Sequence, residues 1–262
     1  AQGTAPAPIL FTFRHDHEYE HGTTGSGTPA DGDSFRIHVY NGGSATLDNT
    51  IIRYGGGSTG DGLIDLDESA GSLTLTNSTL EHSEDHGINS ETGQNLTILN
   101  NVIKDTRLHG IDIYDRVADQ PTGTTIEIRN NTISNVGSSS YPIAISDSDG
   151  LTGTPWITGN IGLNNARNMI DLNSSVSGDL ALDASNQMAW SFGLTVGAGA
   201  TLTLSPGAVV KMSSGIYVSG GHLDAQGTSS DPIVFTSRND HDYGHGTTGS
   251  GTPADGDSFR IH

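Results

Sequence analysis

The chain has 262 residues, with 30 acidic and 11 basic side chains, a formal net charge of −19, 36 glycines and no cysteine. The acidic excess argues against a nucleic-acid-binding protein, because phosphate binding requires Lys and Arg. It suits divalent cations, or solubility outside the cell. The absence of cysteine excludes a disulfide framework. No apolar run approaches 18 residues, so we expect no membrane span in this stretch.

Only 32% of the residues are hydrophobic, which is low for an ordinary globular protein. These residues are nevertheless evenly spaced, and most are β-branched residues or leucine, which is the pattern of many short strands. A solenoid needs less apolar material per residue, because each coil buries its inward face against its neighbours. The composition therefore predicts an all-β solenoid.

The first 38 residues contain one strand and one long polar segment. The strand is PILFTF, at 8–13. Residues 14–34 follow it, are rich in Gly, Thr, Asp and His, and are too long for a turn. Long loops in compact folds are often functional. We expect residues 14–34 to protrude from the solenoid wall.

From residue 33 to about residue 175 a shorter theme recurs. Its first half appears as LDNTII, LTNSTL, ILNNVI and IRNNTI, with a weaker copy ITGNIG. These segments align Asn49, Asn77, Asn100 and Asn130. Asn at an equivalent corner adopts the αL conformation readily, and stacked Asn side chains can hydrogen-bond along an interior ladder. We therefore predict such a ladder at these four residues.

The second half of the theme appears as GLIDL, HGINS, HGIDI, YPIAI and NMIDL. Gly at a corner permits a sharp turn, after which the apolar side chain points inward. Two or three short strands per coil of roughly 23–30 residues predict a parallel β-helix. A leucine-rich repeat is the alternative, but its helix-bearing period is missing.

The chain ends on a second copy of its beginning. Residues 225–262 match residues 1–38 without a gap at an offset of 224, with 30 of 38 positions identical. Repetition at a fixed period is typical of solenoids and arrays, so the chain reads as an excerpt from a tandem array. The alternative is one domain with a duplicated loop. The predicted parts are the end of one unit at 1–38, coils with an Asn ladder at 39–175, a second type of coil at 176–237, and a loop with the start of the next unit at 238–262.

Two blocks carry a family resemblance. The segment from Asn49 to Leu172 resembles the repeats of right-handed, pectate lyase-like parallel β-helices, of the form G-I-x-I…L-T-I-x-N-N-x-I. Residues 194–237 resemble a coil block of tandem-repeat bacterial extracellular surface and fibre proteins. The resemblance implies a right-handed single-stranded parallel β-helix at the cell surface. It specifies function poorly, because this solenoid is shared by lyases, hydrolases, adhesins and inert stalks.

The polar loop contains candidate metal ligands in both copies. They are Asp16, Glu18, Asp31 and Asp33 in the first copy, and Asp240, Asp242, Asp255 and Asp257 in the second. Alternating carboxylates in a Gly-rich loop suit Ca²⁺, which prefers flexible oxygen coordination. The interspersed His15, His17 and His21 would favour Zn²⁺, Cu²⁺ or Ni²⁺ instead. A solvated acidic loop without metal is the third interpretation.

A second polar cluster falls on adjacent predicted coils. It consists of Asp85, His86, Asp105, Arg107, His109 and Asp112. The alignment stacks His86 on His109, Asn89 on Asp112, and His82 on Asp105. A polysaccharide lyase or hydrolase could build a groove from such residues along 84–112. The alternative is a solvated wall of mixed charge, since no catalytic motif is reproduced in full.

The ends of the solenoid decide between these functions. An open β-helix ends in unpaired edges, which proteins cap or pair, and the sequence predicts no capping helix. Joined copies would pair their edges instead, eight or nine coils per unit, each unit advancing about 40 Å. We therefore expect a structural, non-enzymatic unit of an extracellular fibre, stalk or adhesin, with neighbouring copies as its partners and a glycan or cell-surface ligand as a further one.

Overall fold

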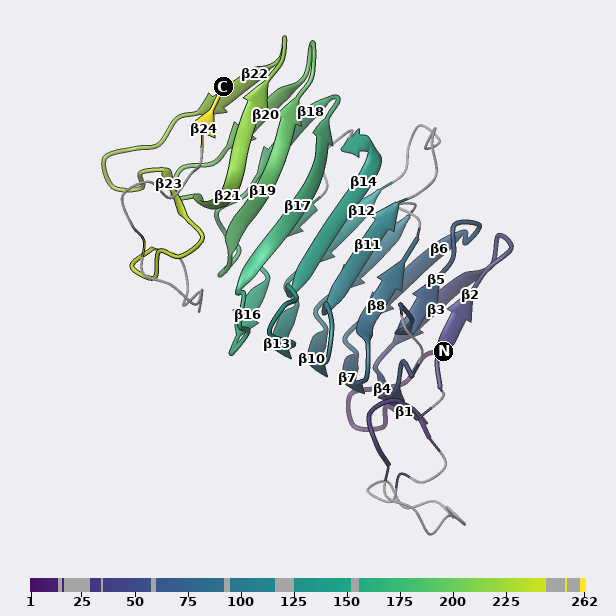
Figure 1. The fold of residues 1–262 in the computed structure, drawn as a ribbon. Helices are drawn as coiled ribbons and strands as arrows, with labels where there is room; N and C mark the ends of the chain where they lie inside the picture. The colour runs from purple at the N-terminus through teal and green to yellow at the C-terminus, as the bar shows by residue number, and fades with distance from the viewer. Residues whose placement is uncertain are drawn as a thin grey trace.

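The computed structural model is a stack of β-strand coils with the two termini at opposite ends (Figure 1). Among the described residues, no helix is long and apolar enough to cross a membrane. The structure describes residues 1–13, 16, 29–33, 35–57, 60–91, 95–115, 125–151, 156–243, 253 and 260–262.

In the described part of the chain, four parallel sheets form the walls of the stack. The six-stranded sheet contains, in order, β1 (Ile9–Thr12), β4 (Thr50–Gly55), β7 (Thr79–Ser83), β10 (Val102–Thr106), β13 (Thr132–Val136) and β16 (Ile161–Leu163). The five-stranded sheet contains β15 (Trp156–Thr158), β12 (Ile126–Arg129), β9 (Leu96–Leu99), β6 (Ser72–Thr76) and β3 (Ser44–Asp48). The three-stranded sheet contains β18 (Asp179–Leu182), β20 (Thr201–Leu204) and β22 (His222–Ala225).

The ten-stranded sheet runs the length of the stack. It contains β2 (Ile37–Val39), β5 (Gly62–Leu66), β8 (His86–Ser90), β11 (Ile111–Asp115), β14 (Ile143–Leu151), β17 (Met169–Val176), β19 (Ala189–Val196), β21 (Val209–Val218) and β23 (Val234–Ser237), with β24 (Arg260–Ile261) also paired to β21. Every strand pair in the four sheets is parallel and joins successive coils. The all-β parallel β-helix predicted from the sequence is thus confirmed.

Alternation of side chains along each strand produces the core. In β6, Leu73 and Leu75 point inward and are fully buried, while Ser72, Thr74 and Thr76 are partly exposed. Leu75 pairs in register with Ile98 of the next coil, which pairs in turn with Ile128. Each buried Leu or Ile contributes about 1.5–3 kcal/mol relative to exposure. Columns of such residues hold the coils together along the stack.

The aligned asparagines occupy the corners, as predicted. Asn49, Asn77, Asn100 and Asn130 have φ values of 50°, 51°, 57° and 55°, and Gly159 has 67° at the equivalent corner. Their side chains, however, do not point inward: Asn49 is half-buried and the other three are exposed. The predicted interior ladder at these four residues is therefore wrong in its position.

The interior ladder lies one residue further along the chain. Asn101, Asn131, Asn160 and Asn186 are all buried. The backbone N–H of Asn101 donates to Asn131 Oδ1 at 2.9 Å, and that of Asn131 donates to Asn160 Oδ1 at 3.0 Å. The physical reason is that a residue with positive φ reverses the chain, so that the next residue is the one that faces the interior.

The shape of the coil changes after β17. Coils from β3 to β17 have three strands each, whereas β18–β19 and β20–β21 form coils of two. Within the described residues this makes seven complete coils, flanked by β1–β2 at one end and β22–β24 at the other. The long strands β17, β19 and β21 merge two walls into one.

The displaced ladder can be tested by substitution. We expect Asn131→Ala to lower the free energy of unfolding by about 2–4 kcal/mol, because it leaves buried amide and carbonyl groups of neighbouring coils without partners. Asn130→Gly should cost less than about 1 kcal/mol, because Gly adopts positive φ without strain. Urea denaturation of the two variants makes the comparison. Equal losses would contradict this assignment of the ladder.

Candidate functional site

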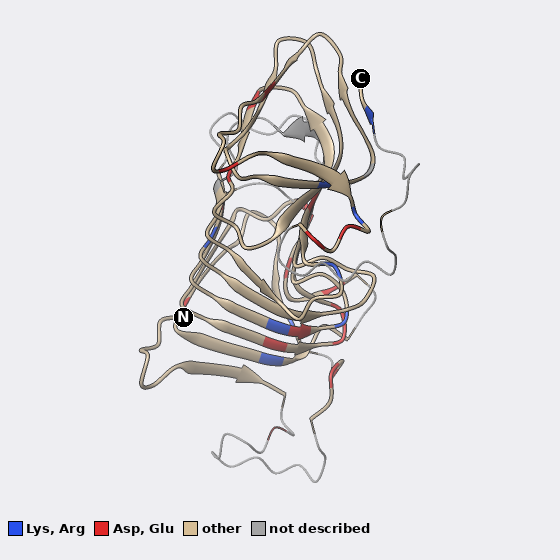
Figure 2. Cartoon of the chain, turned by 90° about the vertical axis from the view of Figure 1, so that its left-hand side faces the viewer, with Lys and Arg blue, Asp and Glu red and all other residues tan. Residues whose placement is uncertain are grey.

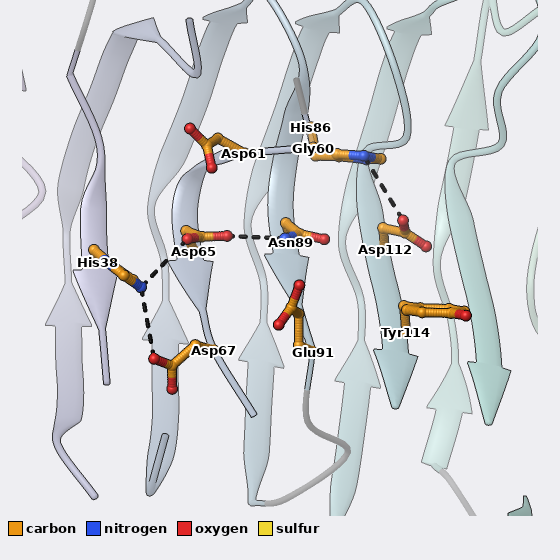
Figure 3. A pocket seen from close by; sticks show the side chains of 10 residues that line it. All are labelled: His38, Gly60, Asp61, Asp65, Asp67, His86, Asn89, Glu91, Asp112 and Tyr114. Atoms are coloured by element: carbon orange, nitrogen blue, oxygen red, sulfur yellow. Dashed lines mark hydrogen bonds and ion pairs between the residues drawn. The ribbon is translucent and has the colours of Figure 1, made fainter. Parts of the chain in front are cut away.

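An open groove of about 430 Å³ lies on the outer face of the ten-stranded sheet (Figure 3). It crosses β2, β5, β8 and β11, and we call it the acidic groove. The residues that line it are His38, Gly60, Asp61, Asp65, Asp67, His86, Asn89, Glu91, Asp112 and Tyr114. Five of these ten residues are carboxylates, so the groove favours cationic or hydrogen-bond-donating ligands.

Strand register generates the central row of the groove. His38 pairs with Asp65, Asp65 with Asn89, and Asn89 with Asp112. Each row member lies between two inward-facing residues, for example Ile64 and Leu66 beside Asp65, so all four side chains point outward. The pairing of Asn89 with Asp112 agrees with the sequence alignment.

Short polar contacts connect neighbours in this row. Asn89 Nδ2 donates to Asp65 Oδ1 at 2.8 Å. His38 Nε2 lies 3.5 Å from Asp65 Oδ2, and Arg36 forms an ion pair with Asp61 at the edge of the groove. Burial raises the pKa of Asp65, and the Asn89 hydrogen bond and the Arg36 charge partly oppose this shift.

Two groups with strongly shifted pKa values meet in the groove. Burial, aided by the charges of His109 and Arg107, lowers the pKa of His86 to about 3. Burial and the neighbouring Asp85 carboxylate raise the pKa of Asp112 to about 6. His86 Nε2 lies 3.6 Å from Asp85 Oδ1 and 3.7 Å from Asp112 Oδ2. His86 is therefore neutral at neutral pH, so these contacts are not ion pairs, and Asp112 is the group that takes up a proton under weakly acidic conditions.

Aromatic rings continue this column along the stack. The His86 and His109 rings stack with centroids 5.4 Å apart, as the sequence alignment predicts, and His109 stacks on Tyr141 at 5.8 Å. The backbone N–H of Tyr141 donates to His109 Nδ1 at 2.9 Å, which leaves the proton of the neutral ring on Nε2. Burial lowers the pKa of His109.

The structure gathers most of the predicted wall cluster. Asp85, His86, His109 and Asp112 lie together, and Arg107 joins them through contacts to Glu84 at 3.1 Å and Asp85 at 3.9 Å. Asp105 does not belong to this group. It lies within β10 with a φ of 56°, and its Oδ1 accepts a hydrogen bond from Asn135 Nδ2 at 2.7 Å.

The described carboxylates of the predicted metal site are spread apart. Asp16 is buried against Arg53, Asp31 lies 3.4 Å from His82, and Asp33 accepts a hydrogen bond from the Ala30 N–H. Asp240 accepts hydrogen bonds from Thr236 and from the N–H of Asp242. Among the residues with described positions, no group of three or more His, Asp or Glu side chains could hold a metal ion. Glu18, Asp255 and Asp257 lie outside the described residues, so the calcium site stays a prediction.

Sequence reasoning missed most of the groove. It did not select His38, Asp61, Asp65, Asp67, Glu91 or Tyr114. A signal was present, because GLIDL, HGINS and HGIDI all carry a polar residue at their fourth position, which a strand turns outward. Asp61 and Tyr114 carry no comparable pattern.

The raised pKa of Asp112 makes a prediction for stability. Between pH of about 4 and 6 the folded chain holds more protons than the unfolded chain, so this group lowers stability as pH rises, and its full cost is present above pH 6. We expect Asp112→Asn to be about 1–3 kcal/mol more stable than the parent at pH 8. The difference should vanish near pH 3, as measured by urea denaturation.

Asp67→Asn is the matched control for this prediction. Hydrogen bonds from Ser69 lower the pKa of Asp67, so its ionised form stabilises the fold above pH 4. Asp67→Asn should therefore be the less stable protein at pH 8. A gain in both variants would show that lost charge repulsion, rather than burial of Asp112, is the cause.

Comparison with known proteins places the fold in a family. Residues 32–234 match the family model described as the right-handed beta helix region. Neither a curated protein nor a solved structure matches the chain. Because the matched segment covers most of the sequence and the structure is a parallel solenoid over the same residues, the chain belongs to the right-handed β-helix family.

Proposed function

We propose that this chain is the repeat unit of a long extracellular rod, in which each unit's last coil is also the coil that starts the next unit. The right-handed β-helix fold is compatible with repeat and surface proteins and with polysaccharide-active enzymes. The choice between them rests on how the two copies of the repeated segment pair.

The two copies pair on opposite sides. Thr12 of β1 pairs with Arg53 of the following coil. Its equivalent, Thr236 of β23, pairs with Lys211 of the preceding coil. Since these residues are the same position of the repeat, one coil would pair with β21 on one side and with β4 on the other. This observation carries the proposal.

The remaining walls behave in the same way. Ile37 pairs with Ile64, whereas its equivalent Ile261 pairs with Ile216. Gln2 forms a parallel bridge to Asp48 of β3. The equivalent of Gln2 in the second copy is Gln226, which directly follows β22, and β22 pairs with β20. In the proposed rod, each of the three walls of the shared coil would thus have a partner on either side.

The described residues around Thr12 and Thr236 also make the same contacts in the two copies. Thr12 Oγ1 donates to Asp16 Oδ2 at 2.7 Å, and Thr236 Oγ1 donates to Asp240 Oδ2. The N–H of Asp16 donates to the Phe13 carbonyl at 3.0 Å, and the N–H of Asp240 donates to the Ser237 carbonyl at the same distance. A segment that folds alike at both ends can be exchanged between them without rearrangement.

This sharing addresses the problem of open edges. Leu223 and Ala225 at one end, and Phe11 and Ile37 at the other, are only partly buried. A following coil would cover the first pair, and a preceding coil the second, which adds apolar burial and backbone hydrogen bonds. Location outside the cell is part of the same proposal, supported by the acidic composition and by the resemblance of residues 194–237 to surface proteins.

A second candidate function is a polysaccharide-active enzyme. The observation that favours it is the position of Asp112, which lies in an open groove beside neutral His86. The pKa of Asp112 is about 6. A carboxyl group of this kind can exchange a proton with a bound sugar. We prefer the structural role because the two copies of the repeated segment pair on opposite sides, as an end-to-end array requires.

Rod formation predicts a length. The seven complete coils plus the shared coil make eight per repeat, which at ~4.8 Å per coil advance about 40 Å. Extending the chain by one or two further copies of residues 39–262 should lengthen it by about 40 Å per copy at constant cross-section. Small-angle X-ray scattering measures both quantities. Thickening without this increase would refute the rod.

Enzymatic activity can be tested directly. We expect no unsaturated or reducing ends when the protein is incubated with pectate, alginate or neutral glycans, because the proposed role is mechanical. Release of such ends by the parent, abolished in both Asp112→Asn and Arg107→Ala, would establish the second candidate instead.

A further inference from the structure

A row of alternating charges, buried at Arg53 and Glu81 and partly exposed at Lys104, lies on the outer face of the six-stranded sheet. Arg53 pairs in register with Glu81, and Glu81 with Lys104. Arg53 Nη1 lies 3.1 Å from Glu81 Oε1, and Lys104 Nζ lies 2.7 Å from Glu81 Oε2. Basic and acidic residues on adjacent coils are visible near the N-terminal end (Figure 2).

The row extends to Asp16 at the N-terminal end. Asp16 Oδ2 lies 3.2 Å from Arg53 Nε, with exposures of 0% for Asp16 and 4% for Arg53. Asp16 therefore belongs to the wall and not to a protruding loop. The carboxylate balances a guanidinium that burial would otherwise make costly.

The equivalent aspartate at the C-terminal end meets a different cation. Lys211 is completely buried, lies in register with Thr236, and donates from Nζ to the carbonyl oxygen of Asp240. Burial lowers the pKa of Lys211, and the charge of Asp240 opposes this shift. Hydrogen bonds, first from Thr236, lower the pKa of Asp240, so this aspartate is ionised.

We infer that the two ends are halves of one seam, in which a single aspartate is shared between Lys211 of one unit and Arg53 of the next. This inference rests on the proposed function. The partner is a second copy of the unit, and the row across the seam reads Lys211, Asp240, Arg53, Glu81 and Lys104 with alternating sign. Neighbouring coils lie ~4.8 Å apart, and opposite charges at such spacing attract strongly where water is excluded.

Sequence differences between the copies agree with this role. His15 is replaced by Asn239, Glu18 by Asp242 and Glu20 by Gly244, whereas the aspartate between them is the same in both copies. A charge that offsets the burial of a cation on each side has no equivalent substitute, because an amide removes that charge from both cations even though it keeps the carbonyl oxygen that accepts from Lys211. The shared aspartate would thereby select a correctly aligned copy over other strand edges.

The test uses the present chain extended at its C-terminus by one further copy of residues 39–262, which places Asp240 at an internal seam. The readout is hydrogen exchange at the amide of Ile233. The equivalent Ile9 N–H donates to the Asn49 carbonyl at 3.1 Å, so a formed seam protects Ile233 in the same way. Amides of β11, far from the seam, report whether each variant is folded.

We expect Asp240→Asn to accelerate exchange at Ile233 roughly tenfold, and Arg53→Met in the second copy to do the same. The double variant should exchange no faster than the faster single variant, because both changes break one interaction. Lys211→Met should be coupled to Asp240→Asn in the same manner. Asp242→Asn, an exposed neighbour, is the control and should have little effect.

Two outcomes separate the inference from the proposed function. If the Ile233 amide is protected but the two single variants of either pair accelerate its exchange independently, so that the double variant shows the product of their effects, the shared aspartate is overturned and the rod stands. The same holds if Asp240→Asn and Asp242→Asn accelerate exchange equally. An Ile233 amide that extension does not protect overturns the rod, and the shared aspartate with it. Arg53→Lys in the second copy keeps the charge and should accelerate exchange less than Arg53→Met.

Discussion

In-register pairing of each coil with the next is the constraint on which the structure depends. Parallel ladders satisfy the backbone groups, and the same register stacks like on like: Leu75 on Ile98, Asn101 on Asn131, His86 on His109. A one-residue slip would turn every inward side chain outward, so burial and hydrogen bonding specify one register together. A consequence of this arrangement is that the outermost strands of the stack carry unpaired backbone N–H and C=O groups, which another coil can bind.

Sequence predicted the architecture well, because a solenoid repeats its local pattern. Strands, corners and the stacking of Asn89 on Asp112 follow from aligned motifs. Alignment of the motifs puts the interior ladder at Asn100 and Asn130. The next residue is also Asn in both motifs, and alignment alone cannot distinguish the corner residue from the buried one. The distinction depends on backbone φ, which appears only in the folded chain.

The candidate sites were harder to predict for a different reason. Asp16 and Asp240 sit in an acidic, Gly-rich segment typical of cation binding, yet the structure engages them with Arg53, Thr236 and the backbone. Arg53 comes from another coil, so local spacing gives no indication of this partner. The acidic groove is likewise lined by residues of four strands from different coils. The pKa of Asp112 is raised by burial, which the amino-acid composition does not predict.

The central claim is that residues 1–38 and 225–262 fold as the same coil, which pairs with a following coil in the first copy and with a preceding coil in the second. Cross-linking can test this claim. The chain has no cysteine, so an introduced pair has no competitor. His38 pairs with Asp65 within this chain, and His262 is the equivalent of His38. In a chain extended by one copy of residues 39–262, His262→Cys should form a disulfide with Asp65→Cys of the second copy as readily as His38→Cys does with Asp65→Cys here, because adjacent strands bring Cα atoms within disulfide range. Cross-linking to Asp67→Cys of the second copy instead, or to neither position, would contradict the account.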